Sequence, residues 1–239
     1  MGHKHKLQRF AENKTFSNVI QPEFSEVFRC DYKLKNKWKA EFWHNDNPIV
    51  LELGCGKGEY TVELAQKYSE KNFIGVDIKG ARFWRGAKTA IEQRIPNVAF
   101  IRSRIEFLNS FFATHEISEI WITFPDPQIE KRRTKKRLTS PRFLNMYKTM
   151  LAPGARIHLK TDSQELHAYT KQVLQYNNQP ILRATTDVYH SELLDDTLAI
   201  KTFYEKQYLE RGKTITYIEF SLTGQEIVDL PEEDDTITN

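Results

Sequence analysis

From Pro48 onward, short apolar runs alternate with longer segments in which apolar residues recur every three or four positions. The apolar runs predict strands over residues 49–53, 72–77, 98–102 and 120–124, and a fifth strand is expected over 156–160. The periodic segments predict helices over 59–68, 79–95 and 163–176. A further helix is expected to begin at Ser140-Pro141, with a capping serine and an N1 proline, and to end at Pro153-Gly154. Alternating strands and helices indicate an α/β fold with a mainly parallel sheet.

The end of the chain predicts a different edge of this sheet. Strands near 181–187 and 214–222 flank a helix over 202–211. They lack an obvious right-handed crossover to a new parallel position, so a mixed edge is expected. Residues 1–47 lack a strong period and predict a basic N-terminal arm with one helix near 33–43. We therefore expect one domain over residues 48–222, preceded by this arm and followed by a tail over 223–239.

Composition adds that this is an ordinary soluble globular chain. Of its 239 residues, 39% are hydrophobic and 28% are charged, which excludes a disordered or fibrous protein. No apolar run approaches the ~20 residues that span a bilayer, and the N-terminus lacks the apolar region of a secretory signal. Cys30 and Cys55 are too few for a disulfide framework or a four-cysteine zinc site. We therefore expect a cytoplasmic protein with reduced thiols and no membrane contact, and leave monomer or homodimer open.

Charge is distributed unevenly along the chain. The net charge is +3, and residues 225–239 hold six acids and no lysine or arginine, so the rest of the chain carries +9. A body this basic indicates a polyanionic partner or substrate. The acidic residues themselves predict a solvated chain end.

A glycine-rich corner follows the first strand of the domain. Gly54, Gly56 and Gly58 let the backbone turn sharply and approach a ligand closely. Asp77 ends the next strand, where an acid can accept hydrogen bonds from two ribose hydroxyls. Together these features predict a site for a nucleoside cofactor. The alternative is a structural turn that binds no ligand.

The residues around this corner narrow the choice of cofactor. The dinucleotide pattern needs a glycine at position 59, which is Glu59, and the phosphate-binding pattern G-x-x-x-x-G-K-[ST] is absent. The acids Glu52 and Glu59 would repel a pyrophosphate but suit a cationic or zwitterionic ligand. S-adenosylmethionine, which carries a sulfonium, an ammonium and no phosphate, therefore fits best.

The fourth strand ends in a second informative stretch, Phe124-Pro125-Asp126-Pro127. In an open α/β sheet, ligands bind beyond the carboxyl ends of the strands. Asp126 would therefore lie beside the cofactor if the first and fourth strands are neighbours. The two prolines stiffen the loop, and a rigid acid suits catalysis that depends on orientation. A plain surface turn is the alternative.

A dense basic run follows this loop at once. Six of the seven residues over 131–137 are cationic: Lys131, Arg132, Arg133, Lys135, Lys136 and Arg137. Such a run is typical of a solvated loop, a localisation signal or a nucleic-acid contact. Its position after Asp126 favours the third reading, because a polyanionic substrate at that site would lie across it.

These stretches together resemble one enzyme family. LELGCGKGEY, IGVD, TFPDPQIEKRRTKKRLTSPRFL, HLKTD and TFYEKQYLERGKTI are similar to segments of the bacterial tRNA (guanine-N7)-methyltransferases, which methylate a guanine in the variable loop of tRNA. The resemblance covers residues 48–222. It implies a class I methyltransferase fold, S-adenosylmethionine as methyl donor and tRNA as partner.

The resemblance also implies roles for individual residues. The expected cofactor contacts are Glu52, Gly54, Gly56, Asp77, Ser103, Arg104 and Asp126. Asp126 is also the acid expected in catalysis. The expected substrate contacts are Lys131, Asp162, Thr202, Tyr204 and Glu205, and the basic run is expected to bind RNA.

The chain departs from the family pattern at three positions. Arg104 stands where the family usually has Asn or Asp near the adenine. Gln128 and Glu130 replace a tryptophan and a lysine, which leaves open whether Lys131 takes over the role of that lysine.

Simpler interpretations remain for some of these residues. Asp162 could be the N-cap of a helix over 163–176, Tyr204 a core residue, and Glu205 part of a solvated helix face. His158, His167 and His190 lack metal-ligand spacing.

Two other functions compete with the main one. An amino-directed methyltransferase also places an acid or amide beside proline after the fourth strand. A non-catalytic RNA-binding protein could retain a decayed methyltransferase fold. The basic run and the Thr-x-Tyr-Glu segment favour tRNA guanine over the former, and the intact Glu52, Asp77 and Asp126 count against the latter.

Overall fold

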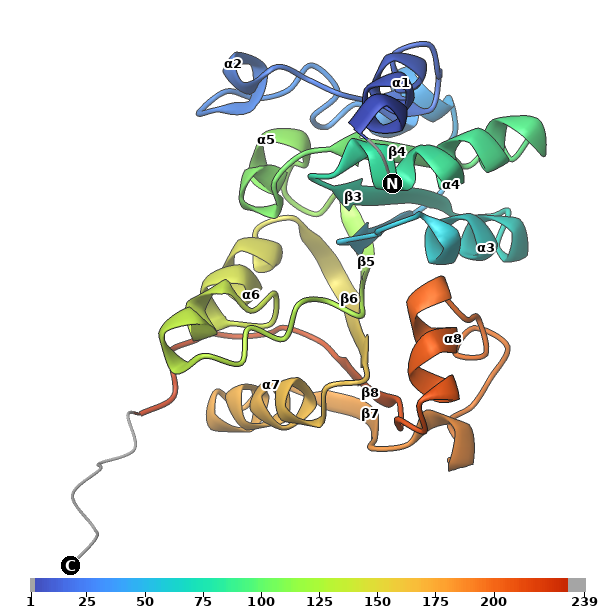
Figure 1. Ribbon diagram of the computed structural model, residues 1–239. Helices are drawn as coiled ribbons and strands as arrows, with labels where there is room; N and C mark the ends of the chain where they lie inside the picture. Colours follow the sequence, from blue (N-terminus) through green and yellow to red (C-terminus); the bar gives the residue numbers. More distant parts are fainter. Residues whose placement is uncertain (1–2, 232–239) are drawn as a thin grey trace, which may run out of the picture.

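The computed structural model describes residues 3–231, which form a sheet of eight strands between two layers of helices (Figure 1). The order across the sheet is β1-β4-β3-β2-β5-β6-β8-β7. The strands are β1 (Val19–Ile20), β2 (Ile49–Leu53), β3 (Asn72–Asp77), β4 (Val98–Arg102), β5 (Ile117–Thr123), β6 (Leu151–Thr161), β7 (Ile181–Thr185) and β8 (Thr216–Phe220).

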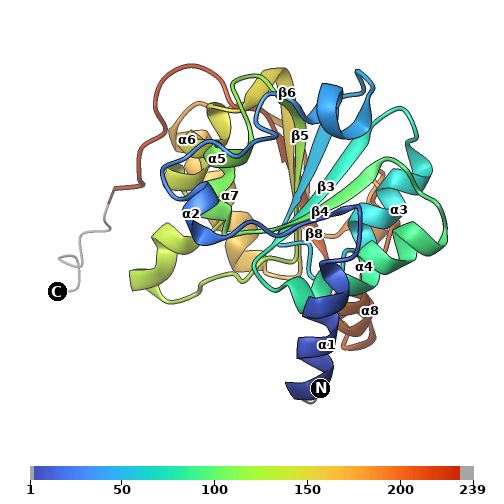
Figure 2. The same ribbon diagram turned by 90° about the horizontal axis from the view of Figure 1, so that it is seen from above.

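Helices cover both faces of this sheet, as the view from above shows (Figure 2). One layer contains α3 (Glu59–Lys67), α4 (Gly80–Glu92) and α8 (Phe203–Glu210), and the other contains α5 (Leu108–Phe111), α6 (Pro141–Lys148) and α7 (Gln164–Tyr176). The remaining α-helices, α1 (His3–Asn13) and α2 (Phe24–Val27), belong to the N-terminal segment. None of the helices in residues 3–231 is long and apolar enough to cross a membrane.

The apolar side chains of the strands fill two separate cores, one on each face of the sheet. In β2, Leu51 and Leu53 belong to the core under α5, α6 and α7, whereas Val50 belongs to the core under α3, α4 and α8. Side chains at successive strand positions point to opposite faces, so a strand buried on both faces reads as a continuous apolar run. Glu52 interrupts that run and lies on the α3 face, at the end of the strand.

The predicted sheet is confirmed, including its mixed edge. The five strands β4, β3, β2, β5 and β6 pair in parallel, and β8 pairs antiparallel to both β6 and β7. β2 lies between β3 and β5, so the strand that precedes the glycine loop neighbours the strand that precedes Asp126. This neighbour relation was the condition on which the sequence argument for Asp126 depended.

The N-terminal segment packs against the rest of the domain instead of extending from it as an arm. β1 adds to the sheet by pairing in parallel with β4. The Asn13 side chain donates to the carbonyl oxygen of Gly80 at 2.9 Å, which fixes α1 on α4. Trp38 is fully buried, and its Nε1 donates to the carbonyl oxygen of Phe111 at 2.9 Å. A π-helix over Trp38–Trp43 takes the place of the helix predicted near 33–43.

Two other boundaries differ from the sequence prediction. α6 ends at Lys148, and the next strand, β6, already begins at Leu151. Pro153 and Gly154 therefore lie within an irregular start of β6 rather than ending the helix. The pairing register between β5 and β6 shifts opposite this stretch, and a bulge is a position where a strand tolerates proline.

The first part of the predicted acidic tail packs on the domain. Asn145 bonds to both the N–H and the carbonyl oxygen of Ile227, and Asn177 does the same for Val228. Ile227 is 2% exposed. The expectation of a solvated end is therefore wrong for this stretch. Residues 232–239, which carry four of the six acids, lie outside the described residues.

Candidate active site

The glycine loop joins β2 to α3 at the carboxyl end of the parallel strands. β2 pairs with β3 on one side and β5 on the other, and such a switch point leaves a crevice at this edge. Gly54 and Gly56 have φ values of +73° and +57°, a left-handed conformation that favours glycine. A Cβ at Gly54 would meet nothing within 4 Å. The loop therefore presents bare backbone to open space, as close approach of a ligand requires.

Asp77 connects the glycine loop to the start of α4. Its Oδ2 accepts the N–H of Gly56 at 3.0 Å, and its Oδ1 accepts the N–H of Lys79 at 2.7 Å. An ionised carboxylate has about four acceptor positions, so capacity for two ligand hydroxyls remains. The structural role of Asp77 in shaping the loop was not evident from the sequence.

Glu52 lies beneath the glycine loop and is 3% exposed. The hydroxyls of Thr61 and Thr123 donate to its two carboxylate oxygens. Burial raises the pKa of Glu52 to about 7, although the two hydroxyl donors oppose the rise. A nearby cation would favour the ionised form of this carboxyl group, so the site suits a cationic ligand.

A cavity of about 80 Å³ opens beside the loop. Its lining includes the glycine loop together with Glu52, Glu59, Arg82, Thr123, Phe124, Thr202 and Tyr204. The N–H of Phe203 donates to Glu59 Oε2 at 2.8 Å, and the Nζ of Lys57 lies 3.1 Å from the centroid of the Phe203 ring. These contacts hold the Thr202–Tyr204 segment over the loop. The fold thus brings together predicted cofactor and substrate residues that are far apart in the sequence.

Asp126 lies on the loop that follows β5, at the same edge of the sheet. The N–H of Phe124 donates to the carbonyl oxygen of Lys160 at 2.8 Å, and the N–H of Gln128 donates to Asp126 Oδ1 at 3.1 Å. Phe124 and Gln128 have φ values of +49° and +48°, a conformation that is strained for non-glycine residues and is often found at functional sites. Asp126 is exposed, so an incoming substrate can reach its carboxylate.

The Thr-x-Tyr-Glu motif begins α8. Thr202 and Glu205 form a capping box, in which Thr202 Oγ1 accepts the N–H of Glu205 at 3.1 Å and the Glu205 carboxylate accepts the N–H of Thr202 at 3.4 Å. Glu205 is fully buried, and its Oε1 lies 2.7 Å from the Nζ of Lys160. The interpretation of Glu205 as part of a solvated helix face is therefore wrong. Tyr204 is 38% exposed and lines the cavity, so the core interpretation of that residue is also wrong.

Asp162 follows β6 and forms an ion pair with Lys213. The N-cap of α7 is Ser163, whose side chain accepts the N–H of Leu166 at 3.1 Å. The interpretation of Asp162 as that cap is therefore wrong. Asp162 is half-buried and lies on the connection that leaves β6, next to β5, the strand that precedes the Asp126 loop.

Ser103 and Arg104 lie one strand beyond Asp77, after β4. Ser103 is buried and donates to the carbonyl oxygen of Arg104 at 3.1 Å. Arg104 is exposed, with its Nε 3.8 Å from the carboxylate of Glu106. These two residues do not line the small cavity; they follow β4, which lies on the side of β3 away from β2.

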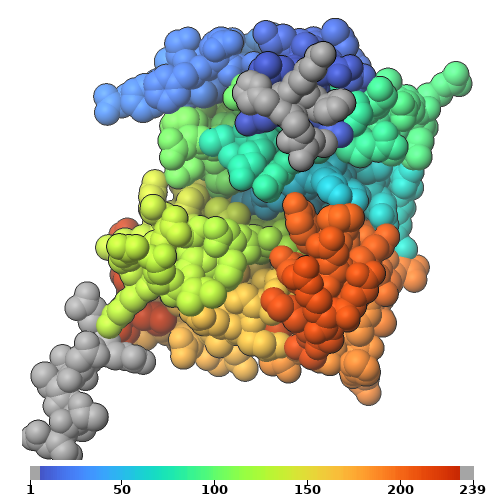
Figure 3. Space-filling model, viewed as in Figure 1, coloured from blue at the N-terminus to red at the C-terminus, as the bar shows by residue number. Residues whose placement is uncertain are grey.

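The basic run forms a single 3-10 helix, η3 (Lys131–Lys136), on the surface. In the space-filling view the yellow-green segment that contains it lies across from the orange segment around α8 (Figure 3). Arg132 and Arg133 contact Glu130 at 2.6 Å and 3.9 Å, and Lys135 contacts Asp229 at 3.7 Å. Within residues 3–231, no acidic partner lies within 4.0 Å of Lys131. Partial pairing of this kind leaves a surface that still carries a positive charge.

Arg137 differs from the other five cations of the run. It is 6% exposed, and its Nε donates to the carbonyl oxygens of Pro127 and Gln128 at 3.0 and 3.3 Å. A second guanidinium nitrogen, Nη2, pairs with Glu165 at 3.0 Å, and the guanidinium lies 4.3 Å from the centroid of the Tyr169 ring. The expectation that Arg137 contacts RNA phosphate is therefore corrected: its donors are used to hold the end of the Asp126 loop.

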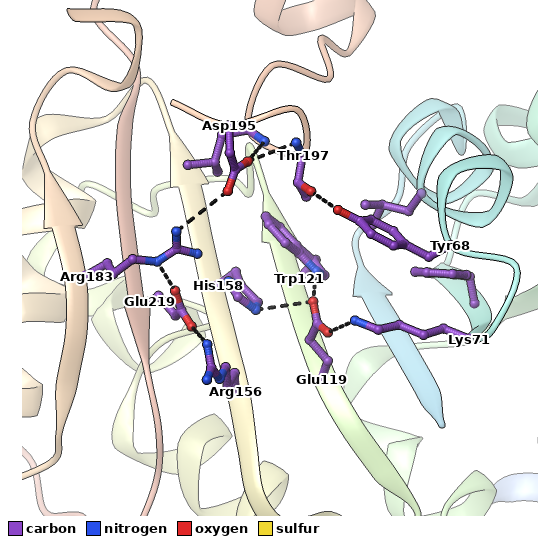
Figure 4. Close-up of a pocket in the computed structure, with 13 residues that line it drawn as sticks. Tyr68, Lys71, Glu119, Trp121, Arg156, His158, Arg183, Asp195, Thr197 and Glu219 are labelled. Atoms are coloured by element: carbon purple, nitrogen blue, oxygen red, sulfur yellow. Dashed lines mark hydrogen bonds and ion pairs between the residues drawn. The ribbon is translucent and has the colours of Figure 1, made fainter. Parts of the chain in front are cut away.

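A second cavity, of about 290 Å³, lies on the α3 face further back along the strands (Figure 4). Its charged groups pair with one another: Lys71 with Glu119, Glu119 with His158, and both Arg156 and Arg183 with Glu219. Burial alone would raise the pKa of Glu119, but the hydrogen bond and charge of His158 and the charge of Lys71 lower it to about 2. Because most charged groups of this cavity pair with one another, we interpret it as a structural charge network rather than a ligand-binding site.

The fold and this edge of the sheet together define a class I S-adenosylmethionine-dependent methyltransferase. A family model described as "Putative methyltransferase" matches residues 46–218. Among solved structures, the 16S rRNA methyltransferase KamB aligns with a TM-score of 0.59 at 12% identity, covering 76% of this chain and 91% of that chain. The 16S rRNA (adenine(1408)-N(1))-methyltransferase from Catenulisporales acidiphilia aligns with a TM-score of 0.54 at 15% identity, covering 77% and 90%. At such identities the likeness establishes the fold.

Sequence relatives establish the family within this class. The tRNA (guanine-N(7)-)-methyltransferase of Christiangramia forsetii is 58% identical over 223 residues, which cover 93% of this chain and all of the relative. The enzyme of the same name from Bacteroides thetaiotaomicron is 48% identical, over 96% of this chain and 90% of the relative. The chain belongs to the bacterial tRNA (guanine-N7)-methyltransferase family.

Proposed function

We propose that this protein transfers a methyl group from S-adenosylmethionine to N7 of a guanine in the variable loop of tRNA, in the cytoplasm. The observation that carries the proposal is the meeting, at one edge of the sheet, of the glycine loop after β2 and the Asp126 loop after β5. The exposed basic run begins only five residues after Asp126. A cofactor turn, an accessible acid and a polyanion-binding surface are thereby adjacent, in a chain that belongs to this family.

The residues present fit S-adenosylmethionine in three respects. The left-handed glycines leave open space beside their backbone, Asp77 has acceptor capacity for the ribose hydroxyls, and Glu52 is a buried acid whose ionised form a cation would favour. Ser103 and Arg104 would border the adenine through their backbone. When bound, S-adenosylmethionine would supply an electrophilic methyl group on its sulfonium, with the electrons of the C–S bond left on sulfur after transfer to N7.

The chain's own contribution is mainly orientation. Guanine N7 carries a free lone pair and no proton, so no general base is needed before attack. Positioning two reactants in line can lower the barrier by ~7–11 kcal/mol. The product ring is cationic, and the carboxylate of Asp126 can stabilise this charge as it develops or accept the guanine N–H groups. Thr202 and Tyr204 would form the opposite wall of the guanine site, with Asp162 at its rim.

Five cations of the run, all except Arg137, would hold the tRNA backbone beside this site. They are Lys131, Arg132, Arg133, Lys135 and Lys136, all of them exposed. Lys131 would also contact the part of the tRNA closest to the methyl-transfer site, because it is the first cation after Asp126. The guanine that enters the site at the carboxyl edge of the sheet would then be positioned by contacts to the tRNA backbone, which depend on RNA shape and charge.

A labelled methyl donor and unmodified tRNA test the function directly. The wild-type protein should label one guanine of the variable loop, and Asp126→Asn should lose most of its kcat while it binds tRNA normally. A matched tRNA with 7-deazaguanine at that position has no N7 nucleophile and should not be labelled. Labelling of the 7-deaza substrate would instead support an amino-directed methyltransferase, and absence of any labelling despite cofactor binding would support a non-catalytic RNA-binding protein.

A further inference from the structure

Lys160 is a buried lysine near the end of β6 that no role assigned above requires. The side chain is 0% exposed, and burial lowers the pKa of its ammonium. The Nζ donates to the carbonyl oxygens of Leu198 and Ile200 at 2.7 and 2.9 Å and pairs with Glu205 Oε1 at 2.7 Å. An ammonium has three donors, so these three acceptors satisfy it completely.

The acceptors of Lys160 all belong to the segment that carries the Thr-x-Tyr-Glu motif. Glu205 Oε1 also accepts the hydroxyl of Tyr189 at 2.7 Å, and the same carboxylate caps the N–H of Thr202. The ammonium of Lys160 and the carboxylate of Glu205 therefore hold residues 198–205 against the sheet. The upper side of this segment presents Thr202 and Tyr204 to the cavity.

The backbone of Lys160 holds the other side of the site. Its carbonyl oxygen accepts the N–H of Phe124 at 2.8 Å, at the point where the Asp126 loop leaves β5. One residue thus fixes the start of the Asp126 loop through its backbone and the Thr202–Glu205 segment through its side chain.

We propose that Lys160, paired with Glu205, is a positioning residue that sets the distance between the Asp126 loop and the Thr202–Tyr204 wall. Glu205 accordingly acts through the segment it caps rather than by direct contact with the guanine. This inference rests on the proposed function, because the two walls matter as a pair only if a substrate lies between them.

The energetics of burying an ion pair distinguish a positioning role for Lys160 and Glu205 from a purely stabilising one. Removing an ammonium and a carboxylate from water opposes folding, and replacing a buried ion pair by apolar residues of similar size is often neutral or stabilising. An apolar pair at positions 160 and 205 can therefore preserve the fold. It cannot reproduce the three directed bonds of the ammonium or the cap on Thr202, so the wall should shift. A misplacement of about 1 Å at a reacting centre can cost ~100-fold in rate.

The test compares Lys160→Met/Glu205→Met with wild type and with Lys171→Met, a control on the exposed surface of α7. At saturating cofactor, the double variant should lose about 100-fold in kcat, with its KM for tRNA within about threefold of wild type. The control should match wild type in both. Glu205→Gln, which keeps the shape of the side chain but disturbs the cap, should lose about tenfold in kcat with the same unchanged KM.

The outcomes distinguish the two proposals. A folded double variant with kcat within threefold of wild type would overturn the positioning role, as would a loss that appears in KM alone. If the double variant does not fold, the test rests on Glu205→Gln. A positioning role predicts that this variant loses kcat while its KM for tRNA is unchanged, and a kcat within threefold of wild type or a loss in KM alone would overturn it. Wild-type protein that binds the cofactor but methylates no tRNA would refute the proposed function, whatever the variants do.

Discussion

We predict that affinity for S-adenosylmethionine rises with pH in the acidic range because Glu52 must ionise to face the cofactor's cationic groups. The carboxyl group is buried, and its pKa is raised from 4.5 to about 7. With that pKa, about 3% of the groups are ionised at pH 5.5 and about half at pH 7. If only the ionised form binds well, affinity should rise roughly 15-fold between these values. The α-amino group of the cofactor, with a pKa near 7.7–8.0, stays protonated over this range.

The same shift makes a linked prediction for stability. A carboxyl group with a raised pKa in the folded state keeps its proton after the unfolded chain has lost it. The unfolded chain is therefore favoured as pH rises from about 4.5 to about 7. Over this window Glu52 should lower the free energy of unfolding by about 3 kcal/mol. Glu52→Gln cannot ionise, so above pH 7 it should be more stable than wild type yet bind the cofactor more weakly.

Calorimetric titration at pH 5.5, 6, 6.5 and 7 measures both affinity and proton release. Wild type should show the rise in affinity and, in buffers of different ionisation enthalpy, the release of nearly one proton at pH 5.5 and about half a proton at pH 7. Glu52→Gln should give a flat profile at the low-pH affinity, whereas Glu92→Gln, an exposed control on α4, should follow wild type. A flat wild-type profile would refute the coupling between Glu52 and the cofactor.

Three further predictions concern the loop, the basic run and Arg137. Asp77→Ala should weaken cofactor binding by roughly 1.5–3 kcal/mol for each charge-assisted bond lost, and unchanged affinity by calorimetry would contradict the ribose role. We expect about three of the exposed cations Lys131, Arg132, Arg133 and Lys136 to contact phosphate. Replacing all four by alanine should then flatten the log–log salt dependence of tRNA binding by about two units, at roughly 0.7–0.9 per phosphate, whereas parallel salt curves would indicate a solvated loop. Arg137→Ala should leave that slope unchanged but lower the free energy of unfolding by about 1–3 kcal/mol, because two carbonyl oxygens lose their donor, which denaturant titration measures.

Local signals in the sequence determined the fold class and predicted the candidate site. Each core strand is a short apolar run, and each crossover helix repeats its apolar positions, so the parallel sheet followed from periodicity alone. Gly54 and Gly56 lie in the turn between one strand and its helix, and Asp77 ends the next strand, so a single strand-helix-strand unit places all three. Asp126 lies in a stretch whose prolines and following cations are themselves unusual. These features depend on residues close together in the chain, and for that reason they can be predicted.

Tertiary structure decided which polar groups are used internally. Arg137 looked like its five basic neighbours, but it is buried against carbonyl oxygens that only the folded loop presents. Glu205 looked like a surface helix residue until the sheet placed Lys160 beneath it. A lysine within residues 156–161 of β6 carried no local signal of burial, although a buried ammonium must find partners. Which partners it finds depends on contacts between distant segments, and no local pattern of residues encodes those contacts.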